Sequence, residues 1–284
     1  MTSQPHILMC RPEFYGVEYE INPWMDRERD VDHALAMQQW ERLYTSLEEA
    51  GTKVSLVPPV KGLPDLVFTA NAAMIFKARA ILSRFRHPQR QGEEQHNALC
   101  LSDHGYNVEL LAEDMFFEGA GDALFCGDTL YAGYRIRSDA RGLQSVGAMV
   151  ERRVIPLELV DPFFYHLDTC FCPIANGVAA YFPAAFDEYG RQVLVESIAD
   201  LIEVEADEAR RFACNAVVLG QKVFTNVGCP KLVEAIESRG FELFETPLDE
   251  FVKAGGSAKC LTLRLDGEDA AGWKRSNENP SSVE

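Results

Sequence analysis

The stretch ALFCGDTLYAGY, residues 123–134, has two short apolar runs joined by a tight polar turn at Gly127, the pattern of a β-hairpin. Three other stretches have the same form: FTANAAMIF (68–76), FCPIANGVAAYF (171–182) and AVVLGQKVFTN (216–226). The turns fall near residues 71, 127, 176 and 220, roughly 45–55 residues apart, with a helical stretch in most gaps. This spacing predicts a repeated unit of hairpin plus helix. Chance spacing of turns in a mixed sheet is the alternative.

Apolar residues at helical spacing predict helices over residues 33–50, 191–203 and 230–239. The first ends at Gly51, and the third has Pro230 at its start and Gly240 just after it. Runs of apolar, β-branched or aromatic residues predict strands at 54–57, 66–69, 123–126, 129–132, 169–174, 178–182, 216–219, 223–225 and 261–265. The alternation of strands and helices indicates an α/β or mixed α+β protein.

Bulk composition limits the partners. The 284 residues are 47% apolar and 25% charged, which is typical of an ordinary globular protein. We predict one domain over residues 1–266 and a polar tail over 267–284. The net charge of −17 repels phosphate backbones and anionic lipid, so we predict no nucleic acid and no membrane as partner. A small cationic substrate would be attracted.

The N-terminal sequence MTSQPHILMCRPEF has no basic segment followed by an apolar core, and no apolar run reaches the roughly 20 residues of a membrane span. The eight cysteines are scattered along the chain. These features predict a cytoplasmic protein with free thiols. They leave the oligomeric state open, a homo-oligomer included.

Common cofactor and metal motifs are missing from the sequence. It has no GxGxxG, no Walker loop and no GxSxG. Cys170 and Cys172 form a CxC pair, but no second Cys or His pair has the spacing of a zinc site. We therefore predict no cofactor and no metal, and we expect these two thiols to be buried strand residues.

Polar residues gather in four stretches with apolar surroundings: PDLVFTAN (64–71), FFEGAGDAL (116–124), FFYHLDT (163–169) and AGGSAKCL (254–261). Each places an acid, an imidazole or a thiol at a strand edge, which is how a scaffold presents side chains to a cleft. Taken singly, Glu118 could be a turn carboxylate, His166 a core histidine and Cys260 a small buried hydrophobe. Together they have the residue types of an orienting acid, a base and a nucleophile.

Three motifs, in chain order, resemble signatures of the guanidino-group-modifying enzyme superfamily: FEGAGDAL (117–124), HLDTCF (166–171) and GGSAKCLT (255–262). This superfamily contains arginine deiminases, amidinotransferases and dimethylarginine dimethylaminohydrolases. The resemblance spans about residues 5–265. It implies an α/β propeller, or pentein, of five ββαβ units with pseudo-fivefold symmetry around a central active site, which agrees with the hairpin repeat.

Carried over by position, the resemblance implies Cys260 as nucleophile and His166 as general acid/base. It implies Asp168 and Glu118 as the carboxylates that bind the guanidinium group. Further residues at the substrate are implied less specifically: Arg90 and Arg137 for the α-carboxylate, and Asp65, Asn71 and Asn22 around the pocket.

Two positions distinguish the branches. Bacterial dimethylarginine dimethylaminohydrolases usually carry Lys where this chain has Asp168, and deiminases carry an acid where it has Asn71, in FTAN. The compact length and these residues resemble arginine dihydrolase domains, which convert arginine to ornithine, ammonia and carbon dioxide. The alternatives are a deiminase that stops at citrulline, a methylarginine hydrolase, and a non-catalytic binding protein on the same fold.

The implied chemistry is metal-free. The Cys260 thiolate attacks the guanidinium carbon, His166 protonates the departing nitrogen, and water then releases the covalent adduct. A second hydrolysis would act on a neutral ureido group, whose oxygen accepts hydrogen bonds. Asn71 can donate to that oxygen whereas an acid cannot, which favours Asn in an enzyme that continues past citrulline.

Overall fold

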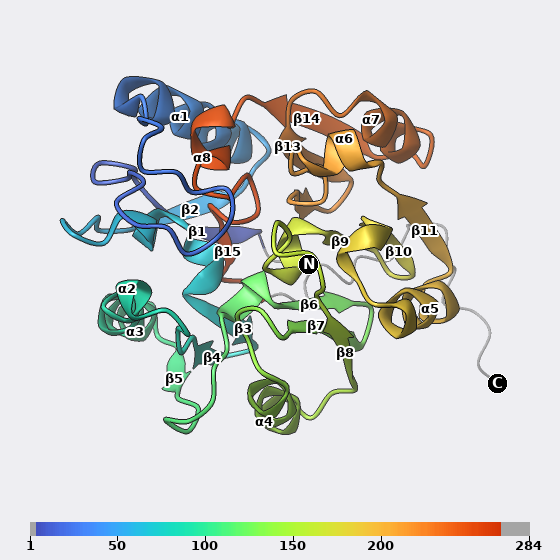
Figure 1. Ribbon diagram of the computed structural model, residues 1–284, viewed down its shortest axis with the longest axis horizontal. Coiled ribbons are helices and arrows are strands. Elements are labelled where there is room, and N and C mark those ends of the chain that lie inside the picture. The colour runs from blue at the N-terminus through green and yellow to red at the C-terminus, as the bar shows by residue number, and fades with distance from the viewer. Residues whose placement is uncertain (1–3, 268–284) are drawn as a thin grey trace.

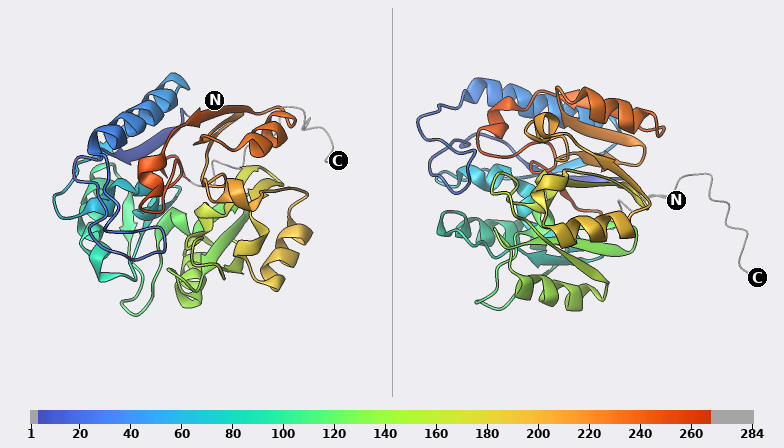
Figure 2. Two further views of the ribbon diagram at one scale, coloured as in Figure 1. Left: turned by 45° about the horizontal axis from the view of Figure 1, so that its top comes forward. Right: turned by 45° about the vertical axis from the view of Figure 1, so that its right-hand side comes forward.

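The computed structural model describes residues 4–267, which form five three-stranded sheets around a common axis (Figure 1). The longer helices lie on the outside of this ring, as Figure 2 shows from two further directions. In four sheets the first two strands form an antiparallel hairpin, and the third strand lies parallel to the second after an intervening helix. This is the five-unit α/β propeller that the resemblance implies, so the fold prediction is confirmed.

The hairpin units run in chain order. Their strands are β3 (Ala73–Phe76), β4 (Arg79–Leu82) and β5 (Asn107–Glu109); β6 (Ala123–Cys126), β7 (Thr129–Tyr134) and β8 (Val154–Glu158); β9 (Phe171–Ala175), β10 (Val178–Tyr181) and β11 (Asp200–Glu203); and β12 (Val217–Leu219), β13 (Lys222–Asn226) and β14 (Glu242–Thr246). The helices are α1 (His33–Glu49), α2 (Pro88–Gln91), α3 (Glu93–Asp103), α4 (Ala140–Val150), α5 (Glu188–Ser197), α6 (Ala206–Ala209), α7 (Pro230–Glu237) and α8 (Asp249–Val252).

The fifth unit combines both ends of the described chain. Strand β15 (Leu263–Arg264) pairs antiparallel with β1 (His6–Cys10), and β1 pairs parallel with β2 (Lys53–Val57) after helix α1. These strands lie side by side in Figure 1 although they come from opposite ends of the sequence. The ring therefore closes through pairing of remote segments, which gives the propeller no hairpin in this unit.

Helix α1 follows the sequence prediction. Asp32 precedes it and accepts a hydrogen bond from the backbone N–H of Leu35, which caps the helix. Its inner face buries Trp40, Leu43 and Leu47, each of which contributes about 1.5–3 kcal/mol through removal from water. The predicted helix at 230–239 is likewise confirmed as α7.

The predicted helix over 191–203 is wrong in its second half. Helix α5 ends at Ser197, and Leu201 and Ile202 belong to β11, where they pair in register with β10. The apolar spacing fits a helix and a strand equally over so short a run. Pairing with the neighbouring strand decides the outcome.

The predicted strand at 66–69 and turn near residue 71 are also wrong. This segment forms two 3-10 helices, η1 (Pro64–Val67) and η2 (Thr69–Asn71). The hairpin of the unit is β3–β4, and it turns at Lys77, where φ is 56°. The three remaining hairpins turn at residues 127, 176 and 220 as predicted.

Two predicted strands begin later than expected. The strand predicted at 169–174 begins at Phe171, after the 3-10 helix η4 (Leu167–Thr169), and the one predicted at 261–265 begins at Leu263. In each case a turn hydrogen bond holds the preceding backbone, from Cys170 N to Leu167 O at 3.0 Å and from Thr262 N to Lys259 O at 3.0 Å. These turns keep the chemically active residues off the strands.

The polar tail predicted at 267–284 lies outside the described residues from position 268 onward, so that tail and the domain boundary at 266 stay predictions. Within residues 4–267, no helix combines the length and apolar character needed to cross a membrane.

Candidate active site

Polar side chains from all five units meet at one end of the inner strands. Each comes from the segment just before the first strand of its unit: Asn71 before β3, Glu118 before β6, His166 and Asp168 before β9, Asn215 before β12, and Cys260 before β15. Hydrogen bonds join one unit to the next, and the backbone bond from Ala70 N to Cys260 O at 3.1 Å closes the ring. Pseudo-fivefold symmetry therefore brings distant sequence positions to one centre.

Cys260 lies in a group that we call the sulfur cluster, made of Cys260, Asp168 and Asn215. The thiol donates to Asp168 Oδ2 at 3.4 Å, and the Asn215 side-chain N–H donates to Cys260 Sγ at 3.1 Å. All three side chains are buried. The structure thus holds the predicted nucleophile between an acid and an amide donor.

The sulfur cluster disfavours a thiolate as it stands. Burial and the neighbouring Asp168 raise the pKa of Cys260 well above its ordinary value, whereas hydrogen bonds from the Ser257 backbone and Asn215 oppose this rise. A cation placed beside the sulfur would remove the penalty, because opposite charge favours the ionised form. The geometry therefore suits a positively charged ligand.

Glu118 bridges His166 and Arg137. Its Oε2 lies 2.7 Å from His166 Nε2 and 3.1 Å from Arg137 Nη1. Burial alone would raise the pKa of Glu118, but Arg137 and His166 lower it below its ordinary range. Burial lowers the pKa of His166 to about 4 despite the carboxylate beside it. A neutral imidazole bonded this way carries its proton on Nε2, so Nδ1 keeps a lone pair and can act as a base.

Asn71 is fixed by partners of opposite character. Its Oδ1 accepts from Arg90 Nη1 at 2.9 Å, and its Nδ2 donates to the Glu118 carbonyl at 3.1 Å. Because Arg donates only and a carbonyl accepts only, the side-chain amide has one satisfactory orientation. Gly121 permits this placement, since a Cβ there would lie 2.2 Å from Asn71 Nδ2.

Arg90 is held largely by the protein itself. It bonds Glu93 in bidentate fashion at 2.8 Å and donates to the Asp65 carbonyl at 3.1 Å in addition to Asn71. Burial raises the pKa of Asp65 despite the nearby Arg90. We call Asn71, Arg90, Glu93, Glu118, Arg137 and His166 the ionic cluster. The assignment of Arg90 and Arg137 to a substrate carboxylate stays a prediction.

The loop between β1 and α1 covers this centre. Asn22 donates to the Ala254 carbonyl at 3.0 Å, and Arg137 Nη2 donates to the Ile21 carbonyl at 3.0 Å. Tyr165 donates to the Gly255 carbonyl at 2.6 Å and stacks under the Arg137 guanidinium at 4.5 Å. Asn22 thus tethers the covering loop, and its predicted contact with substrate stays a prediction.

Several buried polar atoms around the centre lack a hydrogen-bond partner within residues 4–267. They are Arg137 Nε, His166 Nδ1 and Ser257 Oγ. Buried polar groups are normally satisfied, since each unsatisfied one costs free energy. Such atoms gathered near a nucleophile indicate where a polar ligand binds.

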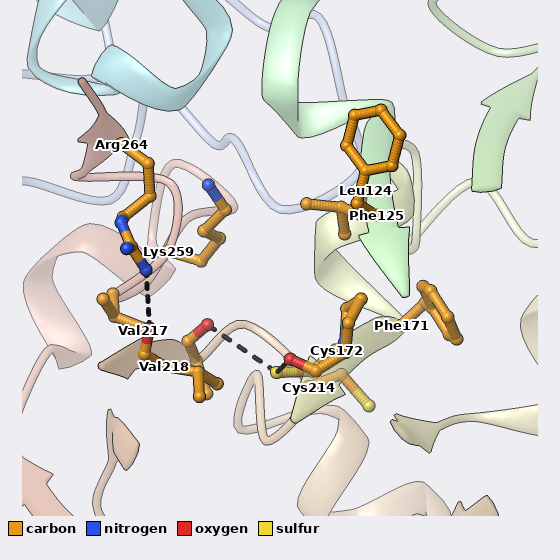
Figure 3. A pocket seen from close by; sticks show the side chains of 11 residues that line it. Leu124, Phe125, Phe171, Cys172, Cys214, Val217, Val218, Lys259 and Arg264 are labelled. Carbon is orange, nitrogen blue, oxygen red and sulfur yellow. Dashed lines mark hydrogen bonds between the residues drawn. The ribbon is translucent and has the colours of Figure 1, made fainter. Parts of the chain in front are cut away.

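A separate cavity lies next to this centre and is mainly apolar. Figure 3 shows Lys259 at this cavity with Cys172, Cys214 and Phe171. Its volume of about 30 Å³ is room for one or two water molecules. Lys259, which precedes Cys260 in the sequence, is among the residues that line this cavity.

Sequence reasoning missed Asn215 and Glu93. Asn215 lies two residues before β12, as Asn71 lies two residues before β3, so aligning the repeats would have found it. No sequence pattern pointed to Glu93, because its contact with Arg90 is formed only in the folded protein. Within the described range 4–267, no three His, Cys, Asp or Glu side chains form a metal-binding group.

Comparison with known proteins gives a consistent family. The family model described as "N,N dimethylarginine dimethylhydrolase, eukaryotic" matches residues 16–266. The bifunctional arginine dihydrolase/ornithine cyclodeaminase ArgZ of a Synechocystis strain is 44% identical over 93% of this chain, which spans 38% of that relative's length. A dimethylarginine dimethylaminohydrolase of Mycobacterium tuberculosis is 38% identical, with 90% of this chain and 84% of the relative covered.

Solved structures agree with this result. Two crystal structures of the N-terminal domain of ArgZ, one bound to substrate and one covalently bound to a reaction intermediate, match with a TM-score of 0.89. Both are 43% identical and cover 92% of this chain and 98% of the solved chain. The similarity thus extends over nearly the whole propeller.

Proposed function

Since this chain belongs to the family of the N,N-dimethylarginine dimethylhydrolases, we propose that it hydrolyses the guanidinium group of L-arginine twice, as an arginine dihydrolase. The products are ornithine, ammonia and carbon dioxide. The chain covers 38% of ArgZ, so this activity is proposed for the arginine dihydrolase part of such a protein. The observation that carries the proposal is the fixed side-chain amide of Asn71, which presents N–H groups where an acid would present only oxygens.

Binding comes first in the proposed mechanism. The planar guanidinium group donates to the carboxylates of Asp168 and Glu118, which places its carbon before the Cys260 sulfur. Its positive charge offsets the effect of Asp168 on the thiol, so the thiolate forms when substrate binds and its proton passes to His166 Nδ1. Arg137 pairs with Glu118 at 3.1 Å and holds this carboxylate in place beside the guanidinium group.

Two hydrolyses follow through the same sulfur. The thiolate forms a C–S bond, and the terminal nitrogen leaves as ammonia after protonation by His166. Water, deprotonated at His166 Nδ1, attacks the amidino adduct, and the C–S electron pair returns to sulfur as the ureido group forms. A second attack releases a second ammonia, a second water frees the carbamate, and the carbamate breaks down to ornithine and carbon dioxide.

A methylarginine hydrolase is the second candidate function. The family description and the 38% identity to the Mycobacterium tuberculosis enzyme favour it. The relative at 44% identity is an arginine dihydrolase, and Asp168 and Asn71 resemble that branch. A deiminase would share the first hydrolysis and stop at citrulline.

Product analysis separates these functions. The purified chain is incubated with L-arginine and, in parallel, with Nω,Nω-dimethylarginine, and amino acids and amines are identified by chromatography over time. We expect ornithine, with twice as much ammonia released as arginine consumed. Citrulline with equal ammonia would assign a deiminase. Turnover of only the methylated substrate, with dimethylamine released, would assign a methylarginine hydrolase.

Two further proposals concern the charge of the substrate and the location of the enzyme in the cell. We propose a small cationic substrate, which the acidic composition supports, and a cytoplasmic location, which the eight free cysteines support. The oligomeric state stays open.

A further inference from the structure

Asn215 is the one member of the sulfur cluster that the resemblance does not assign. It lies just before β12, is 0% exposed and belongs to a different unit from Cys260 and Asp168. Its side chain makes three hydrogen bonds: Oδ1 accepts from Cys260 N at 3.1 Å, and Nδ2 donates to the Asp168 carbonyl at 3.0 Å and to Cys260 Sγ at 3.1 Å. Both amide atoms are thus used on the two other members of the cluster.

These contacts fix which atom faces the sulfur. A rotated side-chain amide would set its N–H against the Cys260 N–H and its oxygen against the Asp168 carbonyl, so two favourable contacts would become repulsive. The Nδ2 group therefore points one hydrogen at the Asp168 carbonyl and the other at Sγ. The donor to sulfur is held by the backbone of both neighbouring segments and needs no reorganisation during reaction.

We propose that Asn215 is a further catalytic residue, whose side-chain N–H stabilises negative charge on the Cys260 sulfur each time the C–S bond forms or breaks. This rests on the proposed function only in taking Cys260 as the nucleophile. The sulfur is charged before attack and again after it is expelled, but neutral in the covalent adduct. A fixed donor therefore stabilises the thiolate and the partly charged transition states more than the neutral resting thiol and the neutral adduct, which lowers the barriers between these neutral states. In a dihydrolase this advantage applies to both hydrolyses.

The groups around the sulfur explain why a hydrogen-bond donor is needed there. Asp168 contacts Sγ, and Tyr165 and Asp168 both interact electrostatically with it. Hydrogen bonds from the Asn215 side chain and the Ser257 backbone favour the charged sulfur in these surroundings.

Two variants test the proposal. Asn215→Ala removes the side-chain amide, and Asn215→Asp keeps an acceptor for Cys260 N–H but replaces the donor with negative charge. We expect kcat to fall about 10- to 100-fold in Asn215→Ala and further in Asn215→Asp, the range for loss of a hydrogen bond to a charged group. The thiolate pKa, followed by ultraviolet absorbance against Cys260→Ala as blank, should rise in the order parent, Asn215→Ala, Asn215→Asp.

Binding distinguishes catalysis from support of the fold. In the Cys260→Ala background, which lacks the sulfur, adding Asn215→Ala should change arginine affinity by less than about 3-fold. Asn226→Ala is the matched control, since this buried amide also ties distant backbone, from Arg211 to Leu248, but touches no sulfur. It should lower the melting temperature and leave the thiolate pKa unchanged.

The proposal is overturned if kcat of both Asn215 variants stays within about 3-fold of the parent. It is also overturned if activity falls while the thiolate pKa stays constant and arginine binding is lost, because Asn215 would then be a purely structural residue. Should Asn215→Ala not fold, Asn215→Asp alone decides by the same measurements. The thiolate titration needs no substrate, so it stands even if the parent proves not to hydrolyse arginine.

Discussion

The sulfur cluster and the ionic cluster lie side by side but treat charge in opposite ways. In the ionic cluster each buried acid has an arginine: Glu118 contacts Arg137, and Glu93 contacts Arg90. In the sulfur cluster Asp168 lies against the thiol and raises its pKa together with burial. The acids of the ionic cluster pair with arginines, whereas the acid of the sulfur cluster contacts the nucleophile, and we propose that a cationic substrate offsets its effect on the thiol. Changes in the first should alter product, orientation and proton transfer, and changes in the second should alter the making and breaking of the C–S bond.

Removing the sulfur should have the largest effect. Cys260→Ala should reduce turnover at least about 1,000-fold, because no other group in either cluster can form the adduct. Arginine binding should persist, since the carboxylates remain, and calorimetry measures it directly. An acid-quenched parent reaction should show an adduct mass on the Cys260 peptide. Cys126→Ala, another buried thiol, should retain turnover, and an adduct on any other cysteine would reassign the nucleophile.

His166→Ala should have the next largest effect on turnover. We expect kcat to fall about 100- to 10,000-fold, the usual contribution of general acid–base catalysis. Glu118 and Arg137 would still pair, so substrate affinity should change much less. Steady-state kinetics on the parent and variant measure both quantities. His104→Ala, which removes an exposed histidine outside both clusters, serves as control. A variant with near-parental kcat would exclude His166 as the proton-transfer group.

Asn71→Asp tests the ionic cluster. The acid would still pair with Arg90, but its second oxygen would face the Glu118 carbonyl and could not donate to a ureido oxygen. An unsatisfied buried pair costs about 1–3 kcal/mol, so the second hydrolysis should slow about 5- to 150-fold relative to the first. Citrulline should then accumulate in the chromatographic time course. Asn97→Asp, a buried amide outside the clusters, should leave the product ratio unchanged; equal slowing of both steps would contradict this role.

The pH dependence sharpens the electrostatic contrast. The pKa of Cys260 is raised in the free protein by burial and Asp168, so kcat/KM should increase by about tenfold per pH unit below that limb. A bound cation lowers the same pKa, so the limb of kcat should lie at lower pH than the limb of kcat/KM. Both limbs belong to the coupled thiol and imidazole. Coincident limbs would mean that substrate charge does not assist ionisation.

The smallest effect is expected outside both clusters. Lys259→Met should change kcat by less than about 3-fold, because its side chain lines the apolar cavity with Cys172 and Cys214. Steady-state kinetics with arginine is sufficient. A large loss with an unchanged melting temperature would show that this lysine contributes to thiolate formation after all.

Much of this arrangement was determined by the sequence alone. The hairpin spacing predicted a repeated unit of hairpin plus helix, because local apolar pattern and turn residues act over a few positions, and the resemblance of the three ordered motifs implied the propeller. The same motifs selected Glu118, His166, Asp168 and Cys260. Those residues lie on turns at equivalent points of the repeated unit, and such a unit can be recognised from the spacing of turns in the sequence.

Tertiary structure decided what depends on contacts between remote segments. Leu201 and Ile202 became a strand because β10 offered a hydrogen-bonding edge, although their spacing also fits a helix. Asn215 lies 45 residues from Cys260, and Cys260 lies 92 residues from Asp168, so only ring closure puts them in contact. Arg90 and Asn71 acquire fixed orientations from buried partners in the same way. Hydrogen bonds act over a few ångströms of space, and the chain order alone does not specify which distant residues will share that space.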